Sequence, residues 1–199
     1  MKSRIETDTT TNRGSGYILV QSLTLVRIPL SILFLIIRLY GKNADLRLVL
    51  SLILLVIIEL TDAFDGKIAR RYGLTSEYGA TLDPFADSIS RLIIYWALAI
   101  TGNVIFLVPL VMAVRDITVA YSRIVLAQNN QTVSAKLSGK VKASVQATGS
   151  FLALFGPLYW DHIGYWSFYA LSWLIITATI LSAIEYVKDA LAALRKDEF

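Results

Sequence analysis

The sequence predicts an all-α protein, a polytopic membrane bundle of six transmembrane helices with both termini in the cytoplasm. Hydrophobic residues make up 55% of the 199 residues, charged residues make up only 17%, and the mean hydropathy is +0.58. Such a composition does not suit a surface in water, so we expect the chain to fold in lipid. Six spans leave no room for a separate soluble domain.

Six apolar stretches approach the roughly 20 residues that a helix needs to cross a bilayer. They lie at about residues 20–40, 46–66, 85–101, 103–126, 138–158 and 165–188, bounded by polar, Gly or Pro residues. Residues 1–19 form a polar segment without the apolar core of a signal peptide. We therefore expect a cytoplasmic N-terminal segment at 1–19 and one membrane domain at 20–199.

The basic residues predict the orientation of the spans. Threading six spans from a cytoplasmic N-terminus puts sixteen of the nineteen Lys and Arg residues on the inner side, and only Arg38, Lys42 and Arg47 on the outer side. This bias follows the positive-inside rule, so the polar 62–87 region is expected to face the cytoplasm. The net charge of +4 then reflects topology and contacts with lipid headgroups, and nucleic acid is not an expected partner.

Four aspartates within residues 62–87 are the candidate chemical groups. If the second span continues as a helix, Asp62 and Asp65 lie three apart on one face. If the next helix begins near Asp83, with Pro84 in its first turn, Asp83 and Asp87 lie four apart on one face. Two helix faces could thus present four carboxylates to a common point.

Crowded carboxylates repel one another, so they stay ionised at a membrane interface only beside cations. The chain has no cysteine, and oxygen donors favour Mg²⁺, Mn²⁺ or Ca²⁺ over Zn²⁺. Gly66 and Ala69 leave space for a ligand, and Arg70 is suited to a diphosphate. A phosphoryl-type transfer is therefore the first reaction to suspect. Any one of these acids could instead be a solvated loop residue, but together they belong to a pattern with eight fixed positions.

That pattern reads Asp-x2-Asp-Gly-x2-Ala-Arg-x8-Gly-x3-Asp-x3-Asp, beginning at Asp62. It resembles the signature of the CDP-alcohol phosphotransferase family at every fixed position. The resemblance implies two divalent ions, Mg²⁺ or Mn²⁺, held by Asp62, Asp65, Asp83 and Asp87, with Asp87 also the catalytic general base. It further implies that the CDP donor is bound by Asp62, Asp65, Gly66, Ala69, Arg70 and Gly79.

Basic residues after the signature point to a phosphorylated acceptor. Arg115 and Arg123 are eight residues apart, about two helical turns, and so lie on similar faces of the fourth span. An arginine within a membrane bundle usually needs an anionic partner. With Lys140 and Lys142, these arginines are expected to bind the acceptor's phosphate. Glycerol 3-phosphate is thus favoured over a neutral amino alcohol.

Within the family, the chain resembles the bacterial phosphatidylglycerophosphate synthases. The shared features are an Arg-Asp pair at 115–116, a Gly-Lys-x-Lys segment at 139–142 and a Leu-Thr-x-x-Arg motif at 23–27. The last motif places Thr24 and Arg27 near the active site. The resemblance implies CDP-diacylglycerol as donor, phosphatidylglycerophosphate as product, and a homodimer.

Two alternatives stay open. Ser88 and Ala143 stand where these synthases commonly have Lys and Thr, and a phosphatidylinositol phosphate synthase or another family member would need similar arginines. A divalent-cation transporter would also carry intramembrane carboxylates. A transporter, however, usually spreads its ligands over several broken helices, whereas these acids fall within one 26-residue stretch.

Overall fold

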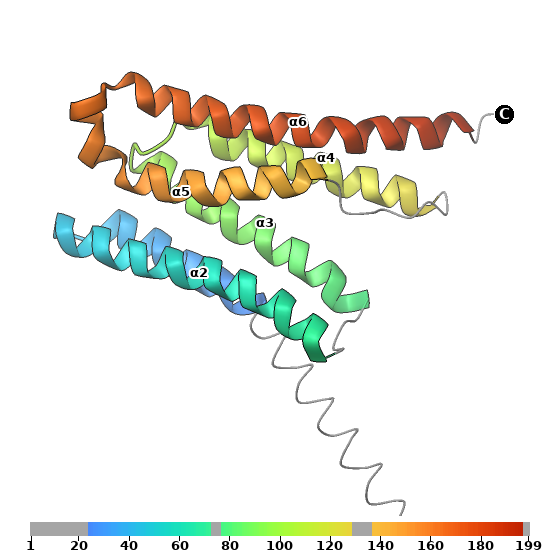
Figure 1. The fold of residues 1–199 in the computed structure, drawn as a ribbon, viewed down its shortest axis with the longest axis horizontal. Helices are drawn as coiled ribbons and strands as arrows, with labels where there is room; N and C mark the ends of the chain where they lie inside the picture. Colours follow the sequence, from blue (N-terminus) through green and yellow to red (C-terminus); the bar gives the residue numbers. More distant parts are fainter. Residues whose placement is uncertain (1–23, 73–76, 129–136, 197–199) are drawn as a thin grey trace, which may run out of the picture. The chain divides into compact units, whose positions relative to one another are not determined.

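The structure is a computed structural model that describes the backbone of residues 24–72, 77–128 and 137–196. Within these ranges it describes all side chains except those of residues 63, 65–72, 77–81, 161 and 195–196. Helices account for nearly all of the described backbone, which contains no strand. They are the helix at 24–40, α2 (Ala44–Tyr72), α3 (Glu77–Ile100), α4 (Leu107–Gln128), α5 (Leu137–Ile163) and α6 (Trp166–Lys196) (Figure 1). The predicted all-α fold with six helices is confirmed.

Several helices extend past the predicted boundaries, for example α2 to Tyr72 and α6 to Lys196, and two of the differences involve proline. The helix that carries Asp83 begins at Glu77, so Pro84 lies inside α3 and not in its first turn. The fifth helix was expected to end at about residue 158, soon after Pro157, but α5 continues to Ile163. A proline removes one N–H from a helix without necessarily ending it, provided that the rest of the helix is held by packing.

A side chain from another segment explains why α5 tolerates Pro157. In a regular helix the N–H of residue 157 would bind the carbonyl of Ala153, and proline has no such N–H. The amide Nδ2 of Asn103 donates to the Ala153 carbonyl instead, at 2.8 Å. Asn103 is buried and follows Gly102, whose φ of 75° forms the tight turn after α3. The turn between α3 and α4 therefore supplies the missing donor.

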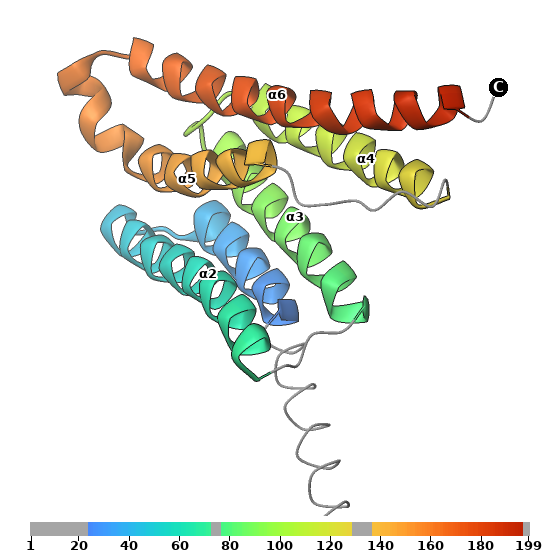
Figure 2. The ribbon, with the colours of Figure 1, turned by 45° about the vertical axis from the view of Figure 1, so that its right-hand side comes forward.

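The described residues form two compact units that divide between Ile94 and Tyr95, with α3 contributing to both. In the first unit, the 24–40 helix and α2 form an antiparallel hairpin (Figure 2). The N–H of Gly41 binds the Ile37 carbonyl at 2.9 Å and ends the first helix. The Asn43 side chain accepts the N–H of Leu46 at 3.0 Å and caps the start of α2.

In the second unit, α6 packs against both α4 and α5. Polar side chains join these helices: Gln146 on α5 donates to the Thr179 hydroxyl at 3.0 Å, and Arg115 on α4 donates to the Ser182 hydroxyl at 2.9 Å. Gly149 allows close approach, because a Cβ there would lie 2.9 Å from Ile175 of α6. Small and hydroxyl-bearing residues at helix contacts are typical of helices packed in lipid.

Large apolar side chains are exposed along the described helices. They include Ile32, Leu33, Ile36, Val49, Ile53, Leu110, Val114, Ile117, Leu152, Trp173, Leu174 and Leu181. The buried positions, in turn, include Ser31, Ser51, Ser150, Ser172 and Thr179. Extended exposed apolar surface marks contact with lipid or a partner. Of the described segments, Trp166–Leu194 is long and apolar enough to cross a bilayer by length and composition.

The bond between Asn103 and Ala153 yields a stability prediction. We expect Asn103→Ala to lower the free energy of unfolding by about 1–3 kcal/mol, because the buried Ala153 carbonyl loses its donor. Denaturation of the detergent-solubilised protein measures the change. Gly102→Asn is the control: asparagine tolerates positive φ, and a Cβ at 102 meets nothing within 4 Å. Equal stability of Asn103→Ala and the wild type would contradict this account of α5.

Candidate active site

The signature acids lie on two helices of the first unit. Asp62 lies in α2, which continues as a helix through Asp65, and Asp83 and Asp87 lie one turn apart in α3. The side chains of five further predicted site residues fall outside the described part of the structure. These residues are Asp65, Gly66, Ala69, Arg70 and Gly79, and their roles stay predictions.

Arg27, at the start of the 24–40 helix, links the two acidic helices. Its side chain is 1% exposed, and its Nη1 binds Oδ1 of Asp62 while Nη2 binds Oδ1 of Asp83 at 2.5 Å. Its Nε donates to the Thr24 carbonyl at 3.3 Å, and the Ser90 hydroxyl donates to the Arg27 carbonyl at 3.3 Å. The structure thus brings Thr24 and Arg27 to the signature acids, and one guanidinium group joins three helices.

A second arginine gathers the remaining described acids. Nε of Arg91 donates to Oδ1 of Asp87 at 2.7 Å, one helical turn away on α3. Nη2 of Arg91 lies 3.7 Å from Oδ2 of Asp62, so Asp62 contacts both arginines. The rest of this guanidinium group binds Glu59 of α2. The side chains of two arginines therefore hold Asp62, Asp83 and Asp87 close together.

The charges in this cluster fit a divalent cation. The four carboxylates of Glu59, Asp62, Asp83 and Asp87 face the two guanidinium groups of Arg27 and Arg91, which leaves a formal charge of −2. The donors are all oxygens, which hard divalent ions prefer. No three acidic or His side chains of the described set are grouped closely enough to hold an ion, although Asp65 falls outside that set.

Sequence reasoning missed Glu59 and Arg91, which lie outside the signature. Their spacing contained a usable signal: Glu59 precedes Asp62 by three residues and Arg91 follows Asp87 by four, so each lies on the same helix face as a signature acid. An ionisable residue inside an apolar span is itself a reason to look for a function.

Three of the four predicted acceptor-binding cations come together in the second unit. Arg115 and Arg123 both lie over the ring of Tyr186, at 6.0 and 5.4 Å from its centroid, which places them on one face of α4. Asp116 joins Arg115 to Lys142, accepting hydrogen bonds at 2.8 and 3.4 Å. The remaining predicted cation, Lys140, is exposed on α5.

Arg123 has unused hydrogen-bonding capacity. Its Nε atom is buried and has no hydrogen-bond partner among the described residues. A buried guanidinium N–H without a partner is costly, and an anionic ligand would satisfy it.

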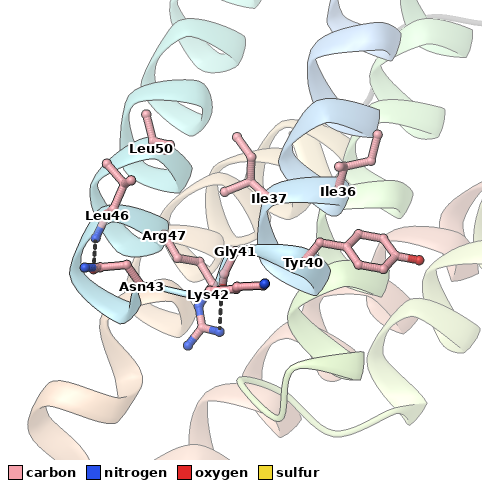
Figure 3. A pocket seen from close by; sticks show the side chains of 9 residues that line it. All are labelled: Ile36, Ile37, Tyr40, Gly41, Lys42, Asn43, Leu46, Arg47 and Leu50. Carbon is pink, nitrogen blue, oxygen red and sulfur yellow. Dashed lines mark hydrogen bonds between the residues drawn. The ribbon is translucent and has the colours of Figure 1, made fainter.

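A separate pocket of about 260 Å³ lies where the 24–40 helix turns into α2 (Figure 3). Apolar side chains such as Ile37, Leu46 and Leu50 form much of its wall, and Lys42 and Arg47 lie beside the turn. The signature acids lie at the opposite end of the hairpin and do not line this pocket. Its lining contains no Asp or Glu, so it offers no carboxylate ligand for a divalent ion.

Comparison with known proteins identifies the class and then the family. Residues 17–184 match the family described as CDP-alcohol phosphatidyltransferase. The class is thus a helical enzyme that transfers phosphatidyl groups in membrane-associated phospholipid synthesis. The chain belongs to the CDP-alcohol phosphatidyltransferase family, which confirms the resemblance seen in the signature and the prediction of an enzyme.

Several curated bacterial proteins are similar over most of their length. A probable phosphatidylglycerophosphate synthase of Mycobacterium tuberculosis (strain H37Rv) is 32% identical over 180 residues, covering 87% of this chain and 81% of the relative. The CDP-diacylglycerol--glycerol-3-phosphate 3-phosphatidyltransferase of Bacillus subtilis (strain 168) is 30% identical over 192 residues, covering 89% and 97%. The enzyme of the same name from Rickettsia typhi is 29% identical over 171 residues, covering 83% and 93%.

The charge balance around Arg27 yields a second prediction. Arg27→Gln changes the formal charge of the cluster from −2 to −3, so the acids repel more strongly. We expect a loss of about 2 kcal/mol in stability without divalent ions, because Asp83 is half exposed and water screens part of the effect. We also expect Mn²⁺ to raise the melting temperature of this variant more than that of the wild type.

Arg47→Gln is the matched control, because Arg47 donates to the Gly41 carbonyl, at the other end of the hairpin. Melting curves in EDTA and in Mn²⁺ provide the comparison. If Mn²⁺ shifts Arg27→Gln and Arg47→Gln equally, Arg27 does not balance the charge of an ion-binding cluster.

Proposed function

We propose that this protein transfers the phosphatidyl group of CDP-diacylglycerol to glycerol 3-phosphate, using Mg²⁺ or Mn²⁺, and releases CMP. The convergence of Asp62, Asp83 and Asp87 on Arg27 and Arg91 carries the proposal, since it concentrates oxygen donors and negative charge at one place. The names of the M. tuberculosis, B. subtilis and R. typhi relatives support the donor and acceptor. Family membership favours this enzyme over a divalent-cation transporter.

The donor is expected at the acidic cluster. Divalent ions bound there would neutralise the donor's diphosphate and stabilise the leaving CMP. We assign Asp62, Asp65, Asp83 and Asp87 to hold two such ions. Gly66, Ala69, Arg70 and Gly79 are assigned to the CDP group, as the signature implies.

Asp87 is the proposed general base. One of its oxygens, Oδ1, accepts a hydrogen bond from Arg91, which orients the carboxylate. The other oxygen can take the proton of the acceptor hydroxyl as that hydroxyl's oxygen attacks the phosphorus bearing the diacylglycerol group. The bond from this phosphorus to the oxygen of CMP breaks, and CMP leaves with the bonding electron pair. No covalent intermediate with the protein is needed.

Arg115, Arg123, Lys140 and Lys142 are the proposed ligands of the acceptor's phosphate. The buried, unpartnered Nε of Arg123 supports this role, as does the gathering of Arg115 and Lys142 around Asp116. Inositol phosphate would satisfy the same cations. A phosphatidylinositol phosphate synthase is therefore the nearest competing assignment within the family.

The proposed setting is a bacterial inner membrane, with six transmembrane helices, cytoplasmic termini and the acids facing the cytoplasm. Exposed apolar side chains along the described helices support lipid contact, and the excess of basic residues near the acids supports the orientation. A homodimer is expected from the family resemblance. Residues 1–19 are assigned to a polar segment and 20–199 to the membrane domain.

An acceptor-substitution assay tests the function. Purified protein with CDP-diacylglycerol, glycerol 3-phosphate and Mn²⁺ is expected to release CMP and form phosphatidylglycerophosphate, and EDTA is expected to stop the reaction. Parallel reactions contain inositol 1-phosphate or serine. CMP release with inositol 1-phosphate alone would reassign the acceptor, and no release with any alcohol would refute the transferase assignment.

Asp87→Asn tests the assignment of the base. Asparagine has nearly the same shape but cannot take up the proton, so we expect kcat to fall by about 100-fold or more. Binding of CDP-diacylglycerol should largely persist, as measured by equilibrium binding. Asp45→Asn is the control, because Asp45 is an exposed acid in the first turn of α2. Normal turnover by Asp87→Asn would show that another group accepts the proton.

A further inference from the structure

Arg91 makes an unusual number of ionic contacts for a side chain that is only 9% exposed. Its Nη1 and Nη2 atoms lie 3.2 and 3.5 Å from the two carboxylate oxygens of Glu59, a two-point contact. Its Nε binds Asp87 at 2.7 Å, and Nη2 also approaches Asp62. A two-point contact fixes the plane of a guanidinium group, and with it the direction of the Nε–H bond.

Glu59 stands in an apolar part of α2. It lies one turn before Asp62, next to the buried Ile58, and its side chain is 22% exposed. Placing an ion pair in such surroundings costs desolvation free energy that an apolar pair of similar volume would avoid. The ion pair of Glu59 and Arg91 is therefore not explained by stability alone. A role in orienting neighbouring side chains, or in balancing the charge of the cluster, explains it better.

We propose that Glu59 and Arg91 are a positioning pair for the base and the metal-binding acids. This inference rests on the proposed function. Glu59 holds the guanidinium plane so that Nε binds one oxygen of Asp87. The second oxygen, Oδ2, accepts no hydrogen bond from a described side chain and stays available to the acceptor hydroxyl.

Glu59 has a second effect, on charge. Without it, the positive charge of Arg91 would be shared by Asp87 and Asp62 alone, and Arg91 would compete with a divalent ion for both carboxylates. With Glu59 present, the four acids outnumber the two arginines, and the cluster keeps its attraction for a divalent ion. Glu59 therefore supports ion binding without being a ligand.

Two substitutions separate these effects. Glu59→Gln removes the balancing charge, so we expect Mn²⁺ affinity to fall about tenfold, measured by calorimetry or the electron paramagnetic resonance of bound Mn²⁺. Arg91→Lys keeps a positive charge but cannot make the two-point contact, so Mn²⁺ affinity should change little. At saturating Mn²⁺, both variants should lose about 10- to 100-fold in kcat, with the donor KM within about threefold of wild type.

A double variant tests whether the two residues act as one unit. At saturating Mn²⁺, Glu59→Gln with Arg91→Gln should lose no more in kcat than Arg91→Gln alone, because the effect of Glu59 on the orientation of Asp87 passes through Arg91. A purely structural ion pair would instead lower the melting temperature and leave the kcat of the folded fraction unchanged. If one variant does not fold, the other single variant still provides the kcat and KM values.

Tyr95→Phe is the matched control. It removes a buried hydrogen bond on the same helix, from the Tyr95 hydroxyl to the Gln146 carbonyl at 2.7 Å, one turn after Arg91. It should lower stability without changing kcat or Mn²⁺ affinity. Wild-type kcat and Mn²⁺ affinity in both Glu59→Gln and Arg91→Lys would overturn the positioning role. An inactive wild type would refute the proposed function instead.

Discussion

Repulsion between carboxylates is the constraint on which the first unit depends. Asp62, Asp83 and Asp87 lie close together on two helices, α2 and α3, and like charges so placed repel one another. Two guanidinium groups hold them in place, one from the 24–40 helix and one from α3 itself. The packing of three helices and the charge of the site are therefore set by the same contacts.

The sequence predicted the helices and the acid cluster for different reasons. Six apolar stretches and an eight-position signature are local features, readable without coordinates. The contact of Arg91 with Glu59 is not local, since it depends on the register of α2 against α3 over 32 residues. The end of α5 was misjudged because the rule for proline considers only its own helix, whereas Asn103, in the turn before α4, replaces the donor that Pro157 lacks.

The acceptor cations show the same division between local and distant information. The eight-residue spacing of Arg115 and Arg123 correctly indicated a shared face, and both contact the ring of Tyr186. Sequence alone did not indicate that Asp116 would pair with both Arg115 and Lys142, because α5 begins more than 20 residues later. An ion pair between residues on different helices depends on tertiary packing, so only the structure reveals it.

The position of Arg27 so early in the chain has a consequence for biosynthesis. This almost fully buried arginine leaves the ribosome 35 residues before Asp62 and 56 before Asp83, the acids that neutralise it. A buried cation is costly until it is paired. The first hairpin therefore cannot complete its ionic contacts when it is first synthesised, and must wait for α3 to emerge and supply Asp83.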